Sequence, residues 1–579
     1  MIKKLLPYLR DYKKESLLGP LFKLLEACFE LIVPLIMASM IDVGIQNHDK
    51  VYIAKMGVVL VLLGILGLVS ALTAQYFAAK AAYGFGTALR RDMFAHCNRL
   101  SFTELDQLGT AGLITRITGD INQAQSGVNM LLRLFMRSPF LVIGALIMAF
   151  RINTKIAWIF AAAVPVLSLV IYGIMAFSMP IYKKGQKQLD RLSLITRENL
   201  LGVRVIRAFS RQTDEERAFT ESSEGMRHFQ LRAGRISALM NPLTYVLVNV
   251  CIILILQQGA KMTNIGDLTQ GEVIALVNYM TQILLALIVL AQLIVTLTRA
   301  AASAVRICEV FAVQPSMDDR ENQQQTPVSG APKVQFENVS FSYGKAQEDA
   351  LSGIDFSVRP GETIGIIGGT GAGKSTLVHL LPRFYDVSTG RILIDGIDVR
   401  RYPFWQLRSK IGIVPQKAVL FRGTIRENMQ WRKKDATDAE IYRALKIAQA
   451  DEVVRQKEGG LDAAVSQGGK NFSGGQRQRL TIARALVGDP EILILDDSAS
   501  ALDYATDARL RSALSKETKD MTVFLVSQRA ASLMHADRIL VLDDGKPVGL
   551  GKHTELFDTC AVYREICLSQ LSEEEVRRA

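Results

Sequence analysis

The sequence is poor in the residues that build metal centres and disulfide frameworks. Its 579 residues include six cysteines and six histidines, and no two cysteines form a C-x-x-C pair. Because zinc sites and disulfide scaffolds need such residues in close spacing, neither is expected. We interpret the cysteines as buried or inert thiols: Cys28, Cys97, Cys251, Cys308, Cys560 and Cys567.

Acidic residues are outnumbered, since 56 Asp and Glu accompany 68 Lys and Arg and leave a formal net charge of +12. Such an excess occurs in nucleic-acid-binding proteins and equally in membrane proteins with basic cytoplasmic loops. Apolar residues make up 49% of the chain and are concentrated in its first half. We therefore interpret the charge as that of a membrane protein, and we expect no nucleic-acid partner.

The first 15 residues mix lysine and arginine with leucine and tyrosine, which predicts a helix lying on the cytoplasmic face of a lipid bilayer. This segment lacks the short apolar core and small-residue cleavage site of a signal peptide. The first membrane span is therefore expected to stay attached.

Six apolar stretches follow, each near the roughly 20 residues that a helix needs to cross the hydrocarbon core. We place them at residues 17–41, 53–77, 130–150, 156–177, 239–257 and 273–297. The long loop after the fourth stretch is rich in lysine and arginine, which marks the cytoplasmic side. The sequence predicts a multi-pass protein of the cell (plasma) membrane with both termini in the cytoplasm.

The two long inner loops are regular enough in apolar spacing to be helices that extend into the cytoplasm. Their far ends, residues 102–109 and 203–213, would suit short helices that dock on a soluble domain. A solvated helical hairpin is the alternative for either end.

A change of composition divides the chain. We assign residues 1–310 to a membrane domain, 311–332 to a polar linker and 333–579 to a soluble domain. From Lys333 apolar and polar residues alternate as in strands, and strands then interleave with helices. The expected fold is membrane α-helical, with six transmembrane helices, followed by an α/β P-loop ATPase domain.

The central motif of the soluble half fits the phosphate-binding pattern G-x-x-x-x-G-K-[ST]. It consists of Gly368, Gly369, Thr370, Gly371, Ala372, Gly373, Lys374, Ser375 and Thr376. The glycines let backbone N–H groups point inward at phosphate, and the following helix presents its positive end. Lys374 would reach the β- and γ-phosphates, and Ser375 would supply a hydroxyl to Mg²⁺. The motif predicts a nucleotide site.

A second group of motifs lies between residues 471 and 503. A helix opens with Phe472, Ser473, Gly474, Gly475 and Gln476, which form a second anion site without a phosphate loop of its own. A buried strand ends in Asp496, which would hold Mg²⁺, and in Asp497, which would orient the attacking water.

Two residues are weaker indications of the same site. Tyr343, at a strand end, could stack on adenine, and the amide of Gln416 could contact Mg²⁺ or the attacking water. Alone, each is more often a packing residue.

Together, in this order, these motifs resemble those of the ATP-binding cassette transporters, of the exporter type with six spans before one cassette. The resemblance covers essentially the whole chain. It implies that residues 472–476 are the signature motif, Asp496 the Walker B aspartate, Gln416 the Q-loop, Tyr343 the A-loop, and Ser500 to Asp503 the D-loop. It also implies that two chains pair around two ATP molecules, each signature motif completing the opposite site, and that the tips at 102–109 and 203–213 are coupling helices.

The departures from the family pattern concern the hydrolytic step. Asp497 stands where the family usually has a catalytic glutamate, and Gln528 where it has the switch histidine. Gln467 also stands where exporters commonly carry glutamate. We therefore predict a heterodimer in which this chain binds ATP and hydrolyses it poorly, while its intact signature motif serves a different subunit. The alternative is a homodimer that uses Asp497 as a weaker base.

The cargo is expected to be a lipophilic drug or a similar small molecule. Alternatives are a lipid, peptide or thiol-compound exporter and an ATP-gated regulatory membrane protein; a self-processing peptide exporter is disfavoured because no N-terminal peptidase-like extension is present. Glu26 and Glu30 lie one helical turn apart on the first span and could bind a cation. An interfacial or helix-pairing role is the alternative for both.

Overall fold

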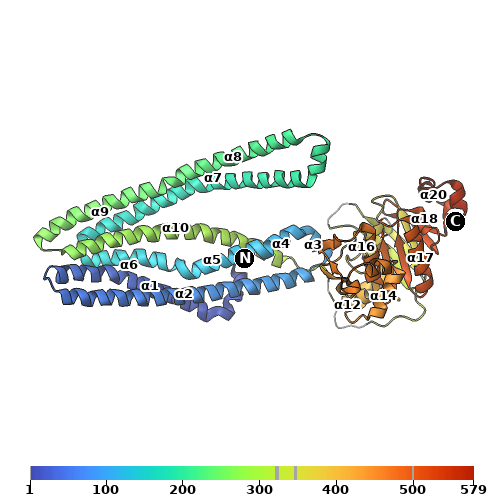
Figure 1. Ribbon diagram of the computed structural model, residues 1–579, viewed down its shortest axis with the longest axis horizontal. Helices are drawn as coiled ribbons and strands as arrows, with labels where there is room; N and C mark the ends of the chain where they lie inside the picture. The colour runs from blue at the N-terminus through green and yellow to red at the C-terminus, as the bar shows by residue number, and fades with distance from the viewer. Residues whose placement is uncertain (1, 318, 320–324, 345–347, 499–500, 579) are drawn as a thin grey trace. The chain divides into compact units, whose positions relative to one another are not determined.

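The computed structural model describes residues 2–317, 319, 325–344, 348–498 and 501–578 (Figure 1). The chain divides into two compact units. The first comprises Met1–Asn98 and Gly109–Val313, and the second Arg99–Leu108 and Gln314–Ala579. Ser500, part of the predicted D-loop, lies outside the described residues.

The first unit is helical, and six of its segments are long and apolar enough to cross a membrane, which confirms the predicted fold class. Its main helices are α1 (Lys13–Ser39), α2 (Lys50–Arg99), α5 (Ile121–Met130), α6 (Arg137–Ile152), α7 (Thr154–Ala208), α8 (Gln212–Ala238), α9 (Met240–Ile265) and α10 (Gln270–Ala312). A short 3-10 segment precedes them at Ile2–Tyr12, a short helix α4 (Thr110–Thr115) precedes α5, and π-helical turns interrupt the spans at Met40–Ile45, Arg116–Asp120 and Leu131–Phe135. At 50 and 55 residues, α2 and α7 are much longer than the roughly 20 residues that cross the hydrocarbon core.

Polar contacts fix the start of α10 against the π-helical turn that follows α1. Thr269 and Glu272 form a capping box at the N-terminus of α10, and Asp42 accepts hydrogen bonds from Gly271 N (2.7 Å) and Thr269 Oγ1 (2.6 Å). Deeper in the unit, the buried Tyr279 hydroxyl donates to Leu31 O at 2.7 Å. These bonds satisfy polar groups that would otherwise be unpaired in an apolar environment.

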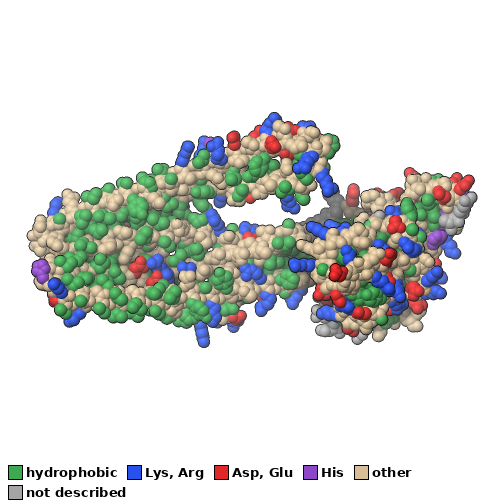
Figure 2. Space-filling model, in the orientation of Figure 1, with side chains coloured by type: hydrophobic (Ala, Val, Ile, Leu, Met, Phe, Trp, Pro, Cys, Tyr) green, Lys and Arg blue, Asp and Glu red, His purple; other side chains and the backbone are tan. Residues whose placement is uncertain are grey.

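The two glutamates of α1 are already paired with cations. Glu26 accepts from Lys23 Nζ at 2.5 Å, and Glu30 accepts from Arg137 Nη2 of α6 at 2.7 Å. Figure 2 shows acidic and basic side chains side by side within the otherwise apolar surface of this unit. This pairing favours the helix-pairing interpretation of both glutamates over a site for a cationic ligand.

The two inner tips differ in structure. Residues 102–108 form a separate short helix, α3 (Phe102–Leu108), which belongs to the second unit. Its Phe102 ring lies 4.6 Å from that of Phe384, and Asp106 accepts a 2.9 Å hydrogen bond from the Tyr385 hydroxyl. The expected separate helix at 203–213 is wrong: α7 continues to Ala208, because nothing before it breaks the helix, and α8 begins at Gln212.

The second unit contains a six-stranded sheet in the order β12-β11-β3-β10-β9-β6. Strands β3 (Thr363–Gly368), β6 (Ile411–Val414), β9 (Ile492–Asp496), β10 (Thr522–Val526) and β11 (Arg538–Asp543) are parallel, and β12 (Lys546–Gly551) is antiparallel at one edge. β9 and β10 are buried along their whole length, as their unbroken apolar sequences predict for central parallel strands.

Two smaller sheets complete the unit. The order of the first is β2-β1-β4-β5, formed by Leu351–Val358, Val334–Phe341, Thr389–Ile394 and Ile397–Asp398, and the second joins β7 (Gly423–Thr424) to β8 (Ala464–Val465). The helices that matter below are α11 (Lys374–Leu380), α14 (Asp438–Ile447), α16 (Gly474–Leu486), α17 (Tyr504–Glu517), α18 (Ala530–Leu533), α20 (Ala561–Leu568) and α21 (Glu573–Arg578). The remaining helices are α12 (Phe404–Lys410), α13 (Ile425–Met429), α15 (Asp451–Arg455) and α19 (His553–Thr559).

Candidate nucleotide site

The parallel sheet itself assembles the candidate site. Four consecutive strands of the sheet are β3, β10, β9 and β6, and the segment after each carboxyl end carries a predicted functional residue. Because parallel strands end at one edge, the phosphate loop, Gln416, Asp497 and Gln528 lie in a single region.

The phosphate loop runs from the end of β3 to the start of α11. The buried Lys374 ammonium donates to Gly368 O (2.8 Å) and Gly369 O (2.6 Å). Gly371 and Gly373 have φ angles of 86° and 88°, in the left-handed region that only glycine enters at low cost. Burial lowers the pKa of Lys374, and the carboxylates of Asp497 and Asp496 oppose that shift. A lysine and a curled loop at a helix N-terminus are suited to bind phosphate.

Two of the three predicted metal-binding residues lie together. Ser375 Oγ donates to Asp496 Oδ1 at 2.9 Å, and Asp496 is almost fully buried. A hydroxyl and a carboxylate are hard oxygen donors of the kind that Mg²⁺ prefers, so this pair fits the ion. The third residue, Gln416, is placed differently, because its amide donates to Asp497 Oδ2 at 3.3 Å.

A residue that sequence reasoning missed also reaches this pair. His379 Nε2 lies 3.6 Å from Asp496 Oδ2. Burial raises the pKa of Asp496, while the Ser375 hydroxyl and His379 act against the rise. His379 follows Ser375 by four positions on α11, so the i, i+4 spacing of a helix could have identified it.

Asp497 follows directly on β9 and lies at the centre of the polar cluster. Its backbone has φ 44°, and its N–H donates to Val526 O at 3.0 Å. Burial raises the pKa of Asp497, whereas hydrogen bonds from the Gln416 side chain and the Gln528 backbone and the charge of Lys374 act against the rise. The carboxylate is therefore close enough to Lys374 for their charges to interact.

Tyr343 lies beside the first turn of α11. Its hydroxyl is 2.9 Å from Thr376 Oγ1, and its ring packs edge-on against those of Phe341 (4.8 Å) and Tyr385 (5.3 Å). The side chain stays 41% exposed, so a ring face is open to a planar partner. Sequence reasoning missed Tyr385, which joins this aromatic group to Asp106 of α3.

The signature motif is a helix start. Ser473 caps α16 through a capping box with Gln476, in which Ser473 N donates to Gln476 Oε1 at 3.0 Å. Phe472 anchors the motif in the core, while Gly474 and Gly475 form the first turn. Within the described part of the chain, no hydrogen bond joins these residues to residues 368–376.

Asp503 has a comparable structural role at the next helix. It caps α17 by accepting from Thr506 N (2.8 Å) and Thr506 Oγ1 (2.9 Å), and these bonds lower its pKa. Gln528 follows β10, and its carbonyl accepts a hydrogen bond from Gln570, a third residue that sequence reasoning missed.

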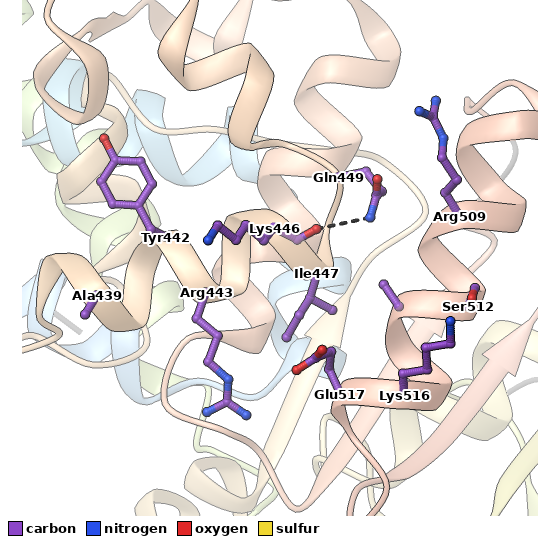
Figure 3. Close-up of a pocket in the computed structure, with 11 residues that line it drawn as sticks. Ala439, Tyr442, Arg443, Lys446, Ile447, Gln449, Arg509, Ser512, Lys516 and Glu517 are labelled. Atoms are coloured by element: carbon purple, nitrogen blue, oxygen red, sulfur yellow. Dashed lines mark hydrogen bonds between the residues drawn. The ribbon is translucent and has the colours of Figure 1, made fainter.

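A large hollow of this domain lies elsewhere. A surface hollow of about 790 Å³ lies between α14 and α17 (Figure 3). Basic side chains project around it in different directions, and it contains none of the predicted nucleotide-binding residues. It is therefore distinct from the candidate nucleotide site.

The geometry defines a class of protein, a P-loop nucleotide-binding domain joined to a six-span membrane domain. Two family models match the chain: ABC transporter transmembrane region over residues 16–287 and ABC transporter over residues 351–500. The chain belongs to the ABC transporter family, and it is an ATP-driven exporter of the multi-pass membrane type. The family binds ATP with Mg²⁺, works in a lipid bilayer and requires two halves.

Several full-length relatives are similar to the chain. An uncharacterized ABC transporter ATP-binding protein of Bacillus subtilis, YfiB, is 35% identical over 99% of each chain. A putative multidrug export ATP-binding/permease protein of the same species, YgaD, is 32% identical over 98% of each, and the ATP-dependent lipid A-core flippase of Albidiferax ferrireducens is 30% identical over 97% of each. The structure of a bacterial Atm1-family ABC exporter with ATP bound superposes with a TM-score of 0.80 at 25% identity, covering 97% of this chain and 99% of that one.

Proposed function

We propose that this chain is one half of a heterodimeric exporter of lipophilic compounds, and that its own ATP site hydrolyses slowly. The observation that carries the proposal is Asp497, whose carboxylate lies in the cluster of Gln416, Lys374 and the Gln528 backbone. This is the position from which a base would orient the attacking water.

The length of Asp497 limits what it can do there. An aspartate is one methylene shorter than the glutamate usual in the family, so its carboxylate falls about 1 Å short, a displacement that costs about 10²-fold in rate. The Gln416 amide also holds the carboxylate, which keeps it from moving toward the nucleotide. The raised pKa of Asp497 further reduces its ionised fraction in acidic conditions.

Gln528 adds to the defect. Its backbone contacts Asp497, so the residue lies beside the position of the attacking water. A neutral amide binds oxygen atoms but cannot titrate as histidine does. The residues that bind ATP are kept, and those that would assist hydrolysis are changed.

The residues that hold nucleotide and metal form the rest of the site. Lys374 and the loop N–H groups would bind the phosphates, Ser375 and Asp496 would hold Mg²⁺, and Gln416 and Asp503 would complete the site's rim. Bound Mg²⁺ would neutralise phosphate charge. ATP would bind the closed dimer better than the open one and would therefore stabilise the closed state. This difference in affinity would drive alternating access.

Two features support a second subunit. The signature motif, residues 472–476, is intact and faces no phosphate loop of its own, which suits donation to a partner's site. At the tip between α7 and α8, four apolar side chains are 61–79% exposed and would suit docking on a partner's cassette: Leu200, Leu201, Val205 and Phe209. We assign the cassette and both termini to the cytoplasmic side of the plasma membrane.

The membrane unit supports a lipophilic cargo. A cavity of about 240 Å³ between α7, α9 and α10 is mostly apolar and includes Met175, Met179 and Met240. Methionine adapts to ligands of varied shape, as a drug or lipid exporter requires. The paired state of Glu26 and Glu30 provides no free charge for a cation.

The test is ATPase activity of the chain purified alone and after co-expression with a candidate partner subunit. We expect activity only in the pair, and its loss when the partner's catalytic glutamate is replaced. Full transport-coupled activity of the chain alone would overturn the heterodimer and establish Asp497 as a sufficient base.

A further inference from the structure

The loop that carries Gln528 is held from a distant part of the chain. This switch loop, residues 527–529, joins β10 to α18. Gln570, 42 residues further on, donates from Nε2 to Gln528 O at 2.8 Å and accepts at Oε1 from Ala530 N at 2.9 Å. One amide thus bonds to the backbone on both sides of Arg529, which fixes the path of the loop.

The segment that carries Gln570 is itself anchored. It connects α20 to α21, and α20 buries Tyr563 and Cys567 completely. His553 bonds to both helices, with Nδ1 2.8 Å from the Tyr563 hydroxyl and Nε2 2.9 Å from Val576 O. Gln570 therefore has a rigid base from which to position the loop.

The switch loop contacts the phosphate end of the site. Ser527 N donates to Ile366 O (3.2 Å) on β3, the strand that leads into the phosphate loop, and Asp497 N donates to Val526 O (3.0 Å). The Gln528 backbone also bonds to the Asp497 carboxylate, and Lys374 of the phosphate loop would reach the β- and γ-phosphates. Tyr343, whose ring would stack on the adenine, lies beside Thr376. A shift of the loop would therefore affect the γ-phosphate and leave the rest of the nucleotide in place.

We propose that Gln570 is a positioning residue through which the C-terminal helices set the switch loop against the γ-phosphate of bound ATP. The inference rests on the proposed function, in which this chain's site holds ATP. It adds a connection between α20–α21 and that site. Since one neutral hydrogen bond changes an equilibrium by about two- to tenfold, loss of Gln570 is expected to weaken ATP binding by about three- to tenfold.

The experiment uses the full-length exporter, purified with the subunit it assembles with. The exporter is equilibrated with radiolabelled 8-azido-ADP and increasing concentrations of ATPγS or ADP, which displace it, and the label still bound to this chain is then fixed by photo-crosslinking. Gln570→Ala should raise the ATPγS concentration needed by about three- to tenfold and leave that of ADP unchanged. Gln570→Glu keeps an acceptor for Ala530 N but loses the donor to Gln528 O. It should therefore also raise the ATPγS concentration needed and leave that of ADP unchanged.

Gln456→Ala is the matched control, because Gln456 makes one local hydrogen bond on an exposed helix end. In this variant, the ATPγS and ADP concentrations needed for displacement should both stay at the wild-type value. Equal weakening of ATPγS and ADP would show that Gln570 only supports the fold, and unchanged displacement in both Gln570 variants would overturn the proposal. Rapid conversion of ATP to ADP at the wild-type site would instead refute the proposal that this site hydrolyses slowly. It would not alter the ratio of the ATPγS and ADP concentrations needed for displacement.

Discussion

Replacing Asp497 by glutamate should restore hydrolysis at this chain's site. Glutamate extends the carboxylate by about 1 Å toward the nucleotide, and a correction of that size is worth about 10²-fold at most. Gln528 remains neutral in the variant, and the Gln416 amide still binds the carboxylate. We therefore expect Asp497→Glu to raise the single-turnover rate by about tenfold to a hundredfold.

The substitution has a cost in stability. Asp497 has φ 44°, a left-handed conformation that aspartate tolerates better than glutamate. Glutamate at this position should lower the free energy of unfolding by about 1 kcal/mol, which would lower the thermal midpoint by a few degrees. Asp544 also has φ 44°, in the turn between β11 and β12, so Asp544→Glu isolates the strain.

The assay is release of labelled phosphate in one turnover, in a dimer whose partner has lost its phosphate-loop lysine. Asp497→Glu should be faster than wild type, while Asp544→Glu should match the wild-type rate and show only the lower midpoint. If Asp497→Glu binds ATP normally and is no faster, side-chain length does not limit hydrolysis and the reasoning is refuted.

Three further predictions follow from other contacts. Glu30→Gln should lower the thermal midpoint of the membrane unit, because it leaves Arg137 without its 2.7 Å partner. Export of a cationic dye per folded molecule should stay unchanged. A selective loss of dye export would restore the cation-site interpretation. Tyr385→Phe removes the bond to Asp106 and should reduce the stimulation of ATPase by transported compound, while unstimulated activity stays near wild type; unchanged stimulation would show that this bond is dispensable. In the cassette, burial opposes ionisation of Glu491, but Lys333 and Lys410 outweigh it and lower its pKa below 4.5. The folded pKa lies below the unfolded one, so Glu491 stabilises the fold above about pH 4.5, and this contribution is lost as the pH falls through the folded pKa. Glu491→Gln should lower the free energy of unfolding by about 0.5–1 kcal/mol at pH 7, after allowance for a half-exposed carboxylate, and by progressively less as the pH falls below about 4.5, as measured by tryptophan fluorescence on heating.

Local patterns in the sequence were sufficient for the main architecture. Unbroken apolar stretches of span length predict the membrane helices, and the six long helices confirm them. The alternation after Lys333 predicts strands, and the sheets of the second unit confirm an α/β domain. Both signals act over a few residues, which is why periodicity detects them.

Contacts between distant residues left no such pattern. The bonds of Gln570 to the switch loop join positions 42 and 40 apart, and Gln416 reaches Asp497 across 81 residues. Only the order of strands in the sheet brings these groups together. The expected helix at 203–213 was wrong for a different reason: a turn of three residues, with Ser210 at φ 53°, is enough to reverse the chain.

The most direct test of the slow site is the identity of the nucleotide that remains on this chain during turnover. The exporter is incubated with doubly labelled ATP and Mg²⁺ while it transports, trapped by rapid cooling, photo-crosslinked, and separated into its chains. The account predicts mainly ATP on this chain and ADP on its partner. ADP at equal levels on both chains would contradict it.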